Sequence, residues 1–257
     1  MKMGNPKLGL IGIIHEETKA DFWGAMSKAA EIGYQGIEGV EPYLLQGDAA
    51  SNVKRFHSLG LQAVTVSASR ESLREELDRL VASAATVEAS HVTVWWGTCE
   101  SKDQLLRDAE LYNRAGARLA AEGVKLCYHN HAHEFRTSFN GVNAMDILVE
   151  YTDPKAVFFE MDIAWITMGG ADPVQVLHKM AGRVPAIHVK DVTTAEAPDQ
   201  WTAVGTGIVR IAPSILKARE IGVNWMVVEQ DRLRNLSPIE TITASYLNLK
   251  EAGLLGD

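Results

Sequence analysis

One stretch of the chain leads from an apolar strand directly into a cluster of polar side chains: Val124-Lys125-Leu126-Cys127-Tyr128-His129-Asn130-His131-Ala132-His133-Glu134-Phe135. Its first four residues are typical of a buried β-strand, and the next eight carry three imidazoles, an amide and a carboxylate. Three later apolar runs end in a similar way, in Glu160-Met161-Asp162, His188-Val189-Lys190-Asp191 and Glu229-Gln230-Asp231. Such side chains at the ends of parallel strands indicate an enzyme active site.

Strand-like and helix-like segments alternate along the whole chain. Strands are expected at 8–14, 36–40, 62–67, 91–96, 124–129, 157–162, 186–190 and 225–229, and helical periodicity is clear at 21–32, 72–88, 101–122 and 214–221. Gly33, Gly60, Gly123 and Gly222 each end a helical segment before the next strand. Eight strand–helix units predict a single (β/α)8 TIM barrel over residues 1–257, with a doubly wound open sheet as the alternative.

Length and composition are those of an ordinary globular protein. The chain has 257 residues, of which 46% are hydrophobic and 23% charged. Its formal charge of -8 argues against nucleic acid as a partner, and no apolar run approaches the roughly 18 residues that a membrane span needs. The start at Met1-Lys2-Met3 does not resemble a signal peptide, and Cys99 and Cys127 are expected to be reduced thiols. We expect a cytoplasmic protein without membrane partners, and the sequence leaves open a homodimer or higher homo-oligomer.

The alternation of side chains along each strand tests whether the polar residues meet. If Ile187, Val189 and Met226 face the helices, the residues that alternate with them along the same strands point into the barrel. The inward set then comprises Cys127, His129, His131, Glu160, Asp162, His188, Lys190, Val227, Glu229 and Asp231. Its polar members predict one site at the carboxyl-terminal face of the barrel.

These motifs, together with Gly33-Tyr34-Gln35-Gly36-Ile37-Glu38, resemble the sugar phosphate isomerase/epimerase family of xylose isomerase-like barrels over nearly the whole chain. The resemblance implies one divalent metal ion, held by two Glu, one Asp and one His, and a small-molecule carbohydrate substrate. Asp162, His188 and Glu229 match three of the ligand positions. Mixed carboxylate and imidazole ligation suits Mn²⁺, the expected ion, or Co²⁺, Mg²⁺ or Zn²⁺.

The fourth ligand position departs from the family pattern. Epimerases of the family usually have a Glu at the end of the fifth strand, where this chain has His129 and Asn130. We expect Glu134, in the following loop, to complete the ligand set, with His131 as the alternative.

The same residues suit the removal of a proton next to a carbonyl. A divalent ion that chelates the carbonyl and a neighbouring hydroxyl would stabilise the resulting enediolate. Glu229 or Glu134 is a candidate base, and His129 or His131 is a candidate proton shuttle. Lys190 is expected to neutralise oxygen charge or to hold a substrate hydroxyl.

Further residues complete the expected site and its surroundings. Candidates for substrate binding, besides Lys190, are His15, Glu38, Trp96 and Asn130. Glu160 is expected either to take part in the site or to form an interior ion pair with Lys125 or Lys190. Asp191 is expected to cap a loop or to support a ligand imidazole. Trp201 is expected in a lid or an oligomer contact, and the surface histidines are expected to be His57, His91 and His178.

The expected function is a metal-dependent sugar isomerase or epimerase acting on a keto sugar. The alternative is a lyase of the same fold that eliminates a group β to the carbonyl of a 3-keto sugar or an inosose, because both reactions begin with the same proton abstraction. A phosphodiesterase or DNA-repair nuclease would need a metal cluster and a basic groove, which this acidic chain does not indicate. A non-catalytic sugar-binding subunit would not need a complete ligand set.

Overall fold

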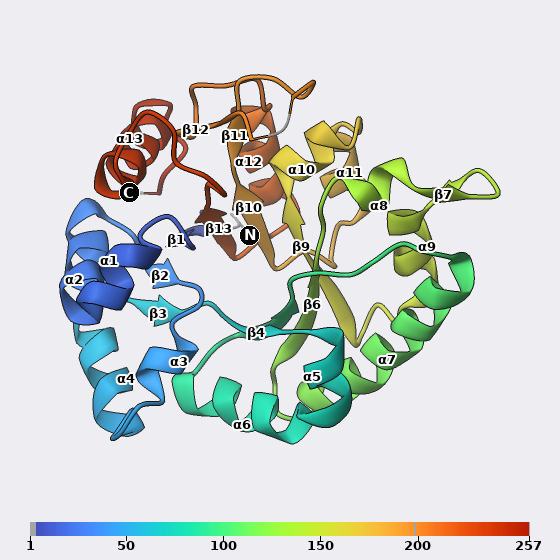
Figure 1. Cartoon of the computed structure of the whole chain (residues 1–257), viewed down its shortest axis with the longest axis horizontal. Coiled ribbons are helices and arrows are strands. Elements are labelled where there is room, and N and C mark those ends of the chain that lie inside the picture. The colour runs from blue at the N-terminus through green and yellow to red at the C-terminus, as the bar shows by residue number, and fades with distance from the viewer. Residues whose placement is uncertain (1–3, 198, 257) are drawn as a thin grey trace.

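The computed structural model describes residues 4–197 and 199–256, which form a barrel of parallel strands inside a ring of helices (Figure 1). The barrel strands are β1 (Lys7–Leu10), β2 (Gly36–Ile37), β3 (Gln62–Ala63), β4 (Thr65–Ala68), β5 (His91–Val94), β6 (Lys125–His129), β9 (Val157–Asp162), β10 (Ala186–Val189) and β13 (Trp225–Val228). They pair in the order β3-β2-β1-β13-β10-β9-β6-β5-β4. Met1-Lys2-Met3, considered above as a chain start, lies outside the described residues.

The barrel closes through one interrupted strand. β3 and β4 stand at opposite ends of the hydrogen-bonded order, yet only Val64 separates them in the chain. Because β3 pairs with β2 and β4 pairs with β5, the two pieces occupy one strand position, and the barrel has eight such positions. The predicted TIM barrel is therefore confirmed, and the doubly wound alternative is excluded.

Helices follow the strands and pack around them (Figure 1). They are α1 (His15–Ala20), α2 (Phe22–Ile32), α3 (Glu41–Leu44), α4 (Ala49–Ser58), α5 (Arg70–Glu75), α6 (Leu77–Val87), α7 (Lys102–Ala120), α8 (His133–Arg136), α9 (Ala144–Tyr151), α10 (Ile163–Met168), α11 (Pro173–Lys179), α12 (Ile211–Glu220) and α13 (Pro238–Glu251). Two hairpins interrupt this pattern: β7 (Ser138–Phe139) with β8 (Val142–Asn143), and β11 (Asp191–Val192) with β12 (Trp201–Thr202).

The strand predicted at 62–67 is split at Val64, and the strands predicted at 36–40 and 91–96 end earlier, at Ile37 and Val94. Two further elements differ from the prediction. The first strand ends at Leu10 rather than at residue 14, since Gly12 has a φ of 75° and turns the chain toward α1. The helix predicted at 72–88 is two helices, because Glu76 leaves the helical conformation with φ -130° and ψ 23°. This break allows α5 to pack against α7 while α6 packs against β4. The four glycines predicted to end helices all have positive φ.

Two apolar clusters hold the barrel together. The larger lies between strands and helices and includes the side chains predicted to point outward, such as Ile187, Val189 and Met226. The smaller fills the amino-terminal half of the barrel interior and consists of Val64, Ala186, Trp225 and Val227. Gly36 faces this cluster closely, since a Cβ there would collide with the Trp225 ring. Beyond this cluster, toward the carboxyl-terminal ends of the strands, the interior becomes polar.

None of the helices in the described part of the chain is long and apolar enough to cross a bilayer.

Cys99 and Cys127 are both free. Burial raises the pKa of Cys99 to about 12 and holds that of Cys127 well above its usual value, so both thiols stay protonated.

Candidate metal and catalytic site

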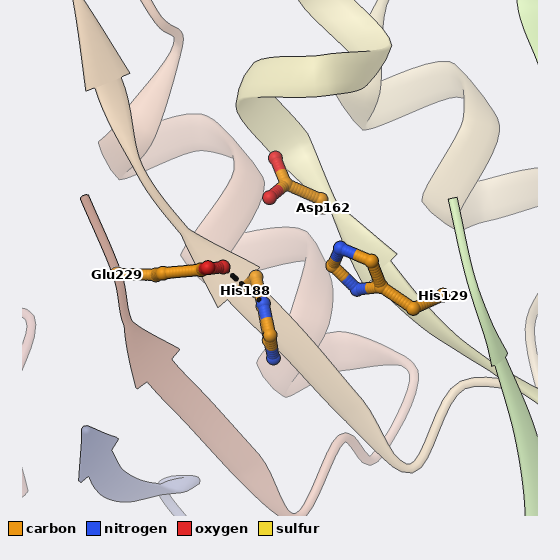
Figure 2. Close-up of side chains that lie close together, drawn as sticks. All are labelled: His129, Asp162, His188 and Glu229. Carbon is orange, nitrogen blue, oxygen red and sulfur yellow. Dashed lines mark hydrogen bonds and ion pairs between the residues drawn. The ribbon is translucent and has the colours of Figure 1, made fainter. Parts of the chain in front are cut away.

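Four polar side chains converge at the carboxyl-terminal end of the barrel (Figure 2). His129 ends β6, Asp162 ends β9, His188 lies in β10, and Glu229 directly follows β13. One potential ligand atom from each residue lies within 4.8 Å of the others. Because β13, β10, β9 and β6 are consecutive in the sheet, strand pairing brings together residues that are distant in the sequence.

The four residues fit a divalent metal ion. Two imidazoles and two carboxylates are a common ligand set for such ions. Within the described chain, the buried Nδ1 of His129 has no hydrogen-bond partner, and Oδ2 of Asp162 has an ion pair with Lys190 at 3.3 Å but no hydrogen bond. Burial, assisted by the charge of His188, holds the pKa of His129 well below its usual value and keeps this imidazole neutral. A buried polar atom without a partner is costly, so an ion bound by Nδ1 of His129 would stabilise the site.

His188 is surrounded by carboxylates on both of its nitrogens. Its Nδ1 lies 2.7 Å from Oε2 of Glu229, and its Nε2 lies 3.1 Å from Oε2 of Glu38 and 3.5 Å from Oε2 of Glu160. Burial alone would lower the pKa of His188, but these carboxylates outweigh it and hold the pKa well above its usual value. The ring is therefore fixed in orientation from two sides.

A buried acidic pair supports His188 from within the barrel. Burial and the neighbouring Glu160 raise the pKa of Glu38 to about 8, whereas the charges of His188 and His91 outweigh burial and lower the pKa of Glu160. Glu38, Glu160 and His188 are themselves close enough to hold a metal ion. Oε1 of Glu160 lies 3.3 Å from Nε2 of His91, which is only 1% exposed. Two expectations are thus wrong: His91 is not a surface residue, and the partners of Glu160 are histidines rather than lysines.

Asp162 is held by hydrogen bonds from the backbone and from Asn130. Its Oδ1 accepts from the backbone N–H groups of Ala164 at 2.9 Å and Trp165 at 2.8 Å, which makes it the N-cap of α10. Burial raises the pKa of Asp162 to about 6, although Lys190 opposes this shift. The Asn130 amide accepts from the Asp162 N–H at 2.9 Å and donates to its carbonyl at 3.4 Å. The structure therefore uses Asn130, expected at the substrate, to position Asp162.

Lys190 is a buried cation beside the proposed ligands. Its Nζ lies 2.8 Å from Oε2 of Glu229, 2.9 Å from Oδ2 of Asp231 and 3.3 Å from Oδ2 of Asp162. Burial alone would lower the pKa of Lys190, but the three carboxylates outweigh it and raise the pKa. The ammonium group also lies 5.2 Å from the ring centre of Trp201. Lys190 therefore stays charged and can donate hydrogen bonds but cannot act as a base.

The structure does not bring Glu134 to the other three proposed ligands. Its Oε1 accepts a hydrogen bond from the Tyr128 hydroxyl at 2.7 Å, and its Oε2 accepts one from the His131 N–H at 2.8 Å. His133 lies 3.4 Å from the same carboxylate. Since His129 stands where Glu134 was expected, the fourth ligand candidate is the residue at the end of the fifth barrel strand.

Aromatic rings form the wall above these polar residues. The His131 ring lies 4.7 Å from that of Trp96 and 5.2 Å from that of Trp165, measured between ring centres. Burial and the charge of Lys190 lower the pKa of His131 to about 3, so its imidazole is neutral. Trp96 is 43% exposed and stands at the mouth of the site. His15 and Glu38 both line a cavity of about 480 Å³.

Two tryptophans have a larger part in this wall than the sequence indicated. Trp165 packs against His131 with its ring tilted, and it lies 4.9 Å from Trp201 between ring centres. Its position three residues after Asp162, in the first turn of a helix that starts at a strand end, was the signal that it would face the site. Trp201 was expected in a lid or an oligomer contact, but it is 2% exposed and packs inside the barrel mouth.

A sequence profile of the family described as xylose isomerase-like TIM barrel matches residues 26–249. The chain belongs to this family. The match runs from α2 to α13 and confirms the resemblance seen in the motifs.

Relatives named inosose dehydratase share parts of the sequence. The protein from Geobacillus kaustophilus (strain HTA426) is 32% identical over 126 residues, which are 43% of this chain and 40% of the relative. The protein from Lacticaseibacillus casei is 24% identical over 224 residues, which are 80% of this chain and 70% of the relative. The chain thus spans less than half the length of the first relative.

Solved structures show the same barrel. A sugar phosphate isomerase/epimerase from Parabacteroides distasonis ATCC 8503 has a TM-score of 0.81 and 23% identity, over 98% of this chain and 96% of that chain. The IOLI protein with a bound zinc atom has a TM-score of 0.74 and 14% identity, over 95% of this chain and 97% of that chain. At these identities, the likeness establishes the fold alone.

Proposed function

We propose that this protein is a divalent-metal-dependent sugar isomerase or epimerase that removes a proton next to the carbonyl of a keto sugar. The convergence of His129, Asp162, His188 and Glu229 at the ends of four adjacent strands carries the proposal. Membership of the xylose isomerase-like family and the zinc atom in the IOLI structure support it. Mn²⁺ is the ion that we expect, with Co²⁺, Mg²⁺ and Zn²⁺ as alternatives.

The four converging residues would hold the ion, and Glu38 and Glu160 would keep His188 oriented toward it. When bound, the ion would polarise the substrate carbonyl and favour negative charge on its oxygen. His129 takes the place of Glu134 in this ligand set. Glu134 instead orders the turn after β6 through Tyr128 and the His131 N–H.

Three side chains supply the acid–base chemistry in this proposal. Lys190 and His188 outweigh the burial of Glu229 and hold its pKa well below the usual value, so this carboxylate is ionised and is our candidate proton acceptor. His131 is neutral, its Nδ1 has no partner among the described residues, and it is our candidate for relaying the proton. Lys190 would donate a hydrogen bond to a substrate oxygen.

A lyase of the same fold is an equally supported candidate, because the relatives reported above are named inosose dehydratase. Elimination would use the same proton abstraction and then expel a group from the β carbon. Glu229 and Lys190 would keep their roles, and the proton taken from the α carbon would be returned to the leaving oxygen, which departs as water or an alcohol.

A screen of keto sugars and inososes with added Mn²⁺ tests the proposal and separates its two branches. After the ion is removed by chelation, ¹H NMR of the products would show an epimer or isomer in one case and an unsaturated, dehydrated product in the other. If the metal-loaded protein converts no keto sugar in a broad panel, the proposed function is contradicted.

A further inference from the structure

We propose that the substrate is a neutral, unphosphorylated carbohydrate, an inference that rests on the proposed function and narrows its substrate class. TIM barrels that act on phosphate esters commonly bind the phosphate with backbone N–H groups and cations in the loops after the seventh and eighth strands. In this barrel those strands are β10 and β13. In this chain, the backbone N–H groups and arginines of these two loops already bind other groups of the protein.

The loop after β10 has the glycine-rich form of an anion-binding loop, but Asp191 fills it. The Asp191 carboxylate accepts hydrogen bonds from the backbone N–H groups of Gly205 at 3.0 Å, Gly207 at 2.8 Å and Val209 at 3.1 Å, and from its neighbour Val192 at 2.9 Å. A Cβ at Gly207 would collide with this carboxylate, so the loop is shaped around it. A phosphate group would have to displace a buried carboxylate from these donors.

The cations of the loop after β13 are paired as well. Nη1 of Arg232 lies 3.0 Å from Oδ2 of Asp199. Nη1 of Arg234 donates to the Asp199 carbonyl at 3.2 Å and to the side chain of Gln200. Both arginines therefore tie the loop after β13 to the β11–β12 hairpin, which leaves fewer free donors for an anion.

The electrostatics of the polar interior oppose a phosphate dianion. Five carboxyl groups lie there around Lys190 and His188: Glu38, Glu160, Asp162, Glu229 and Asp231. Lys190 is already within 3.3 Å of three of them. A phosphorylated substrate would bring its own negative charge beside these carboxylates, and their repulsion would disfavour its binding.

The wall of the site offers what a neutral sugar needs. Nε1 of Trp165, Nε1 of Trp201 and Nδ1 of His131 are buried and lack hydrogen-bond partners among the described residues. Hydroxyl and ring oxygens of a sugar can accept from such donors and satisfy them. The half-exposed ring of Trp96, beside His131, supplies an apolar face for the C–H groups of a sugar ring.

Matched pairs of ligands test this inference. Isothermal titration calorimetry on the Mg²⁺-loaded protein would compare D-fructose with fructose 6-phosphate and D-xylulose with xylulose 5-phosphate, and would use inorganic phosphate as a competitor. We expect at least one neutral ketose to bind about tenfold or more tightly than its ester, and inorganic phosphate not to displace it. Trp165→Phe keeps an aromatic ring, although a smaller one, and removes the indole N–H; it should weaken sugar binding roughly two- to tenfold. Trp23→Phe on α2, remote from the site, is the matched control.

Tighter binding of the esters, displacement by inorganic phosphate, or failure of every neutral sugar to bind while the metal still binds would overturn the inference. Exchange of the substrate's α-hydrogen with solvent, measured on the same ligands, distinguishes an error in the substrate class from an error in the proposed function. If an ester binds better and exchanges its α-hydrogen with solvent, the substrate class is wrong and the proposed chemistry stands. If a neutral sugar binds but no ligand exchanges, the substrate class stands and the proposed chemistry is contradicted.

Discussion

His188 and Glu229 come from adjacent strands, and Nδ1 of the imidazole lies 2.7 Å from Oε2 of the carboxylate. Glu38 holds the opposite ring nitrogen at 3.1 Å. The ring therefore cannot rotate without breaking an interaction at one end or the other. A metal-ligating histidine typically has one ring nitrogen held by a carboxylate and the other directed at the ion. In our proposal Glu38 holds Nε2, and Nδ1 and Glu229 would bind the ion together.

Removing a proposed ligand should remove the metal. His188→Ala or Asp162→Ala leaves three of the four donors, so we expect at least a hundredfold loss of Mn²⁺ affinity and loss of turnover. Titration calorimetry with Mn²⁺ and elemental analysis of the purified variants measure this directly. His178→Ala, at an exposed position on α11, is the control and should bind metal normally. Unchanged metal affinity in both variants would refute the ligand assignment.

Substitutions at His129, His131 and Glu134 distinguish ligand from proton relay. His129→Ala should lower metal affinity, because Nδ1 of this imidazole has no hydrogen-bond partner in the described chain and is available to the ion. His131→Asn should keep the metal but reduce turnover by roughly 10²–10⁴, the usual contribution of an acid or base. Glu134→Gln should also keep the metal. If Glu134→Gln loses the ion while His129→Ala retains it, then Glu134 is the fourth ligand.

The buried pair of His91 and Glu160 should contribute to stability. His91→Leu leaves Oε1 of Glu160 without its partner, so we expect a loss of about 1–3 kcal/mol in the free energy of unfolding. Urea denaturation of the metal-free protein measures it. His178→Leu serves as the surface control. An unchanged unfolding midpoint in His91→Leu would show that the pair adds nothing.

Asp191 should order the segment 191–210 and thereby hold Trp201 in the site wall. Asp191→Ala frees four backbone N–H groups, so we expect faster tryptic cleavage at Arg210 and a red shift of tryptophan fluorescence. Asp153→Ala, which removes a single bond to the Lys155 N–H at an exposed position, is the matched control. Protease resistance equal to that of the unmodified protein would contradict this role.

The barrel and the main ligand candidates were predictable from local pattern. Strand parity placed His188, Asp162 and Glu229 at the same end of the interior, and parallel pairing then determined that they would meet. Periodicity could not show the break at Glu76, because it depends on what α5 and α6 pack against.

The remainder of the site depended on contacts that sequence spacing does not show. Glu134 is drawn to the Tyr128 hydroxyl by the turn after β6, so its distance from the ligands could not be inferred from its position in the motif. His91 begins a strand, where solvent exposure seemed the simpler expectation, yet Glu160 on another strand supplies its partner inside the barrel. Metal-binding motifs were thus easier to predict than the residues that orient them.

The most direct measurement is hydrogen exchange at the carbon next to the carbonyl of a bound keto sugar in D₂O. We predict that deuterium enters this position, in product or recovered substrate, only when the divalent ion is present, and that Glu229→Gln abolishes the exchange. Chelation should stop exchange and return of the ion should restore it. Complete retention of the original hydrogen during turnover, or full exchange in rigorously metal-free protein, would contradict the proposed metal-dependent proton abstraction.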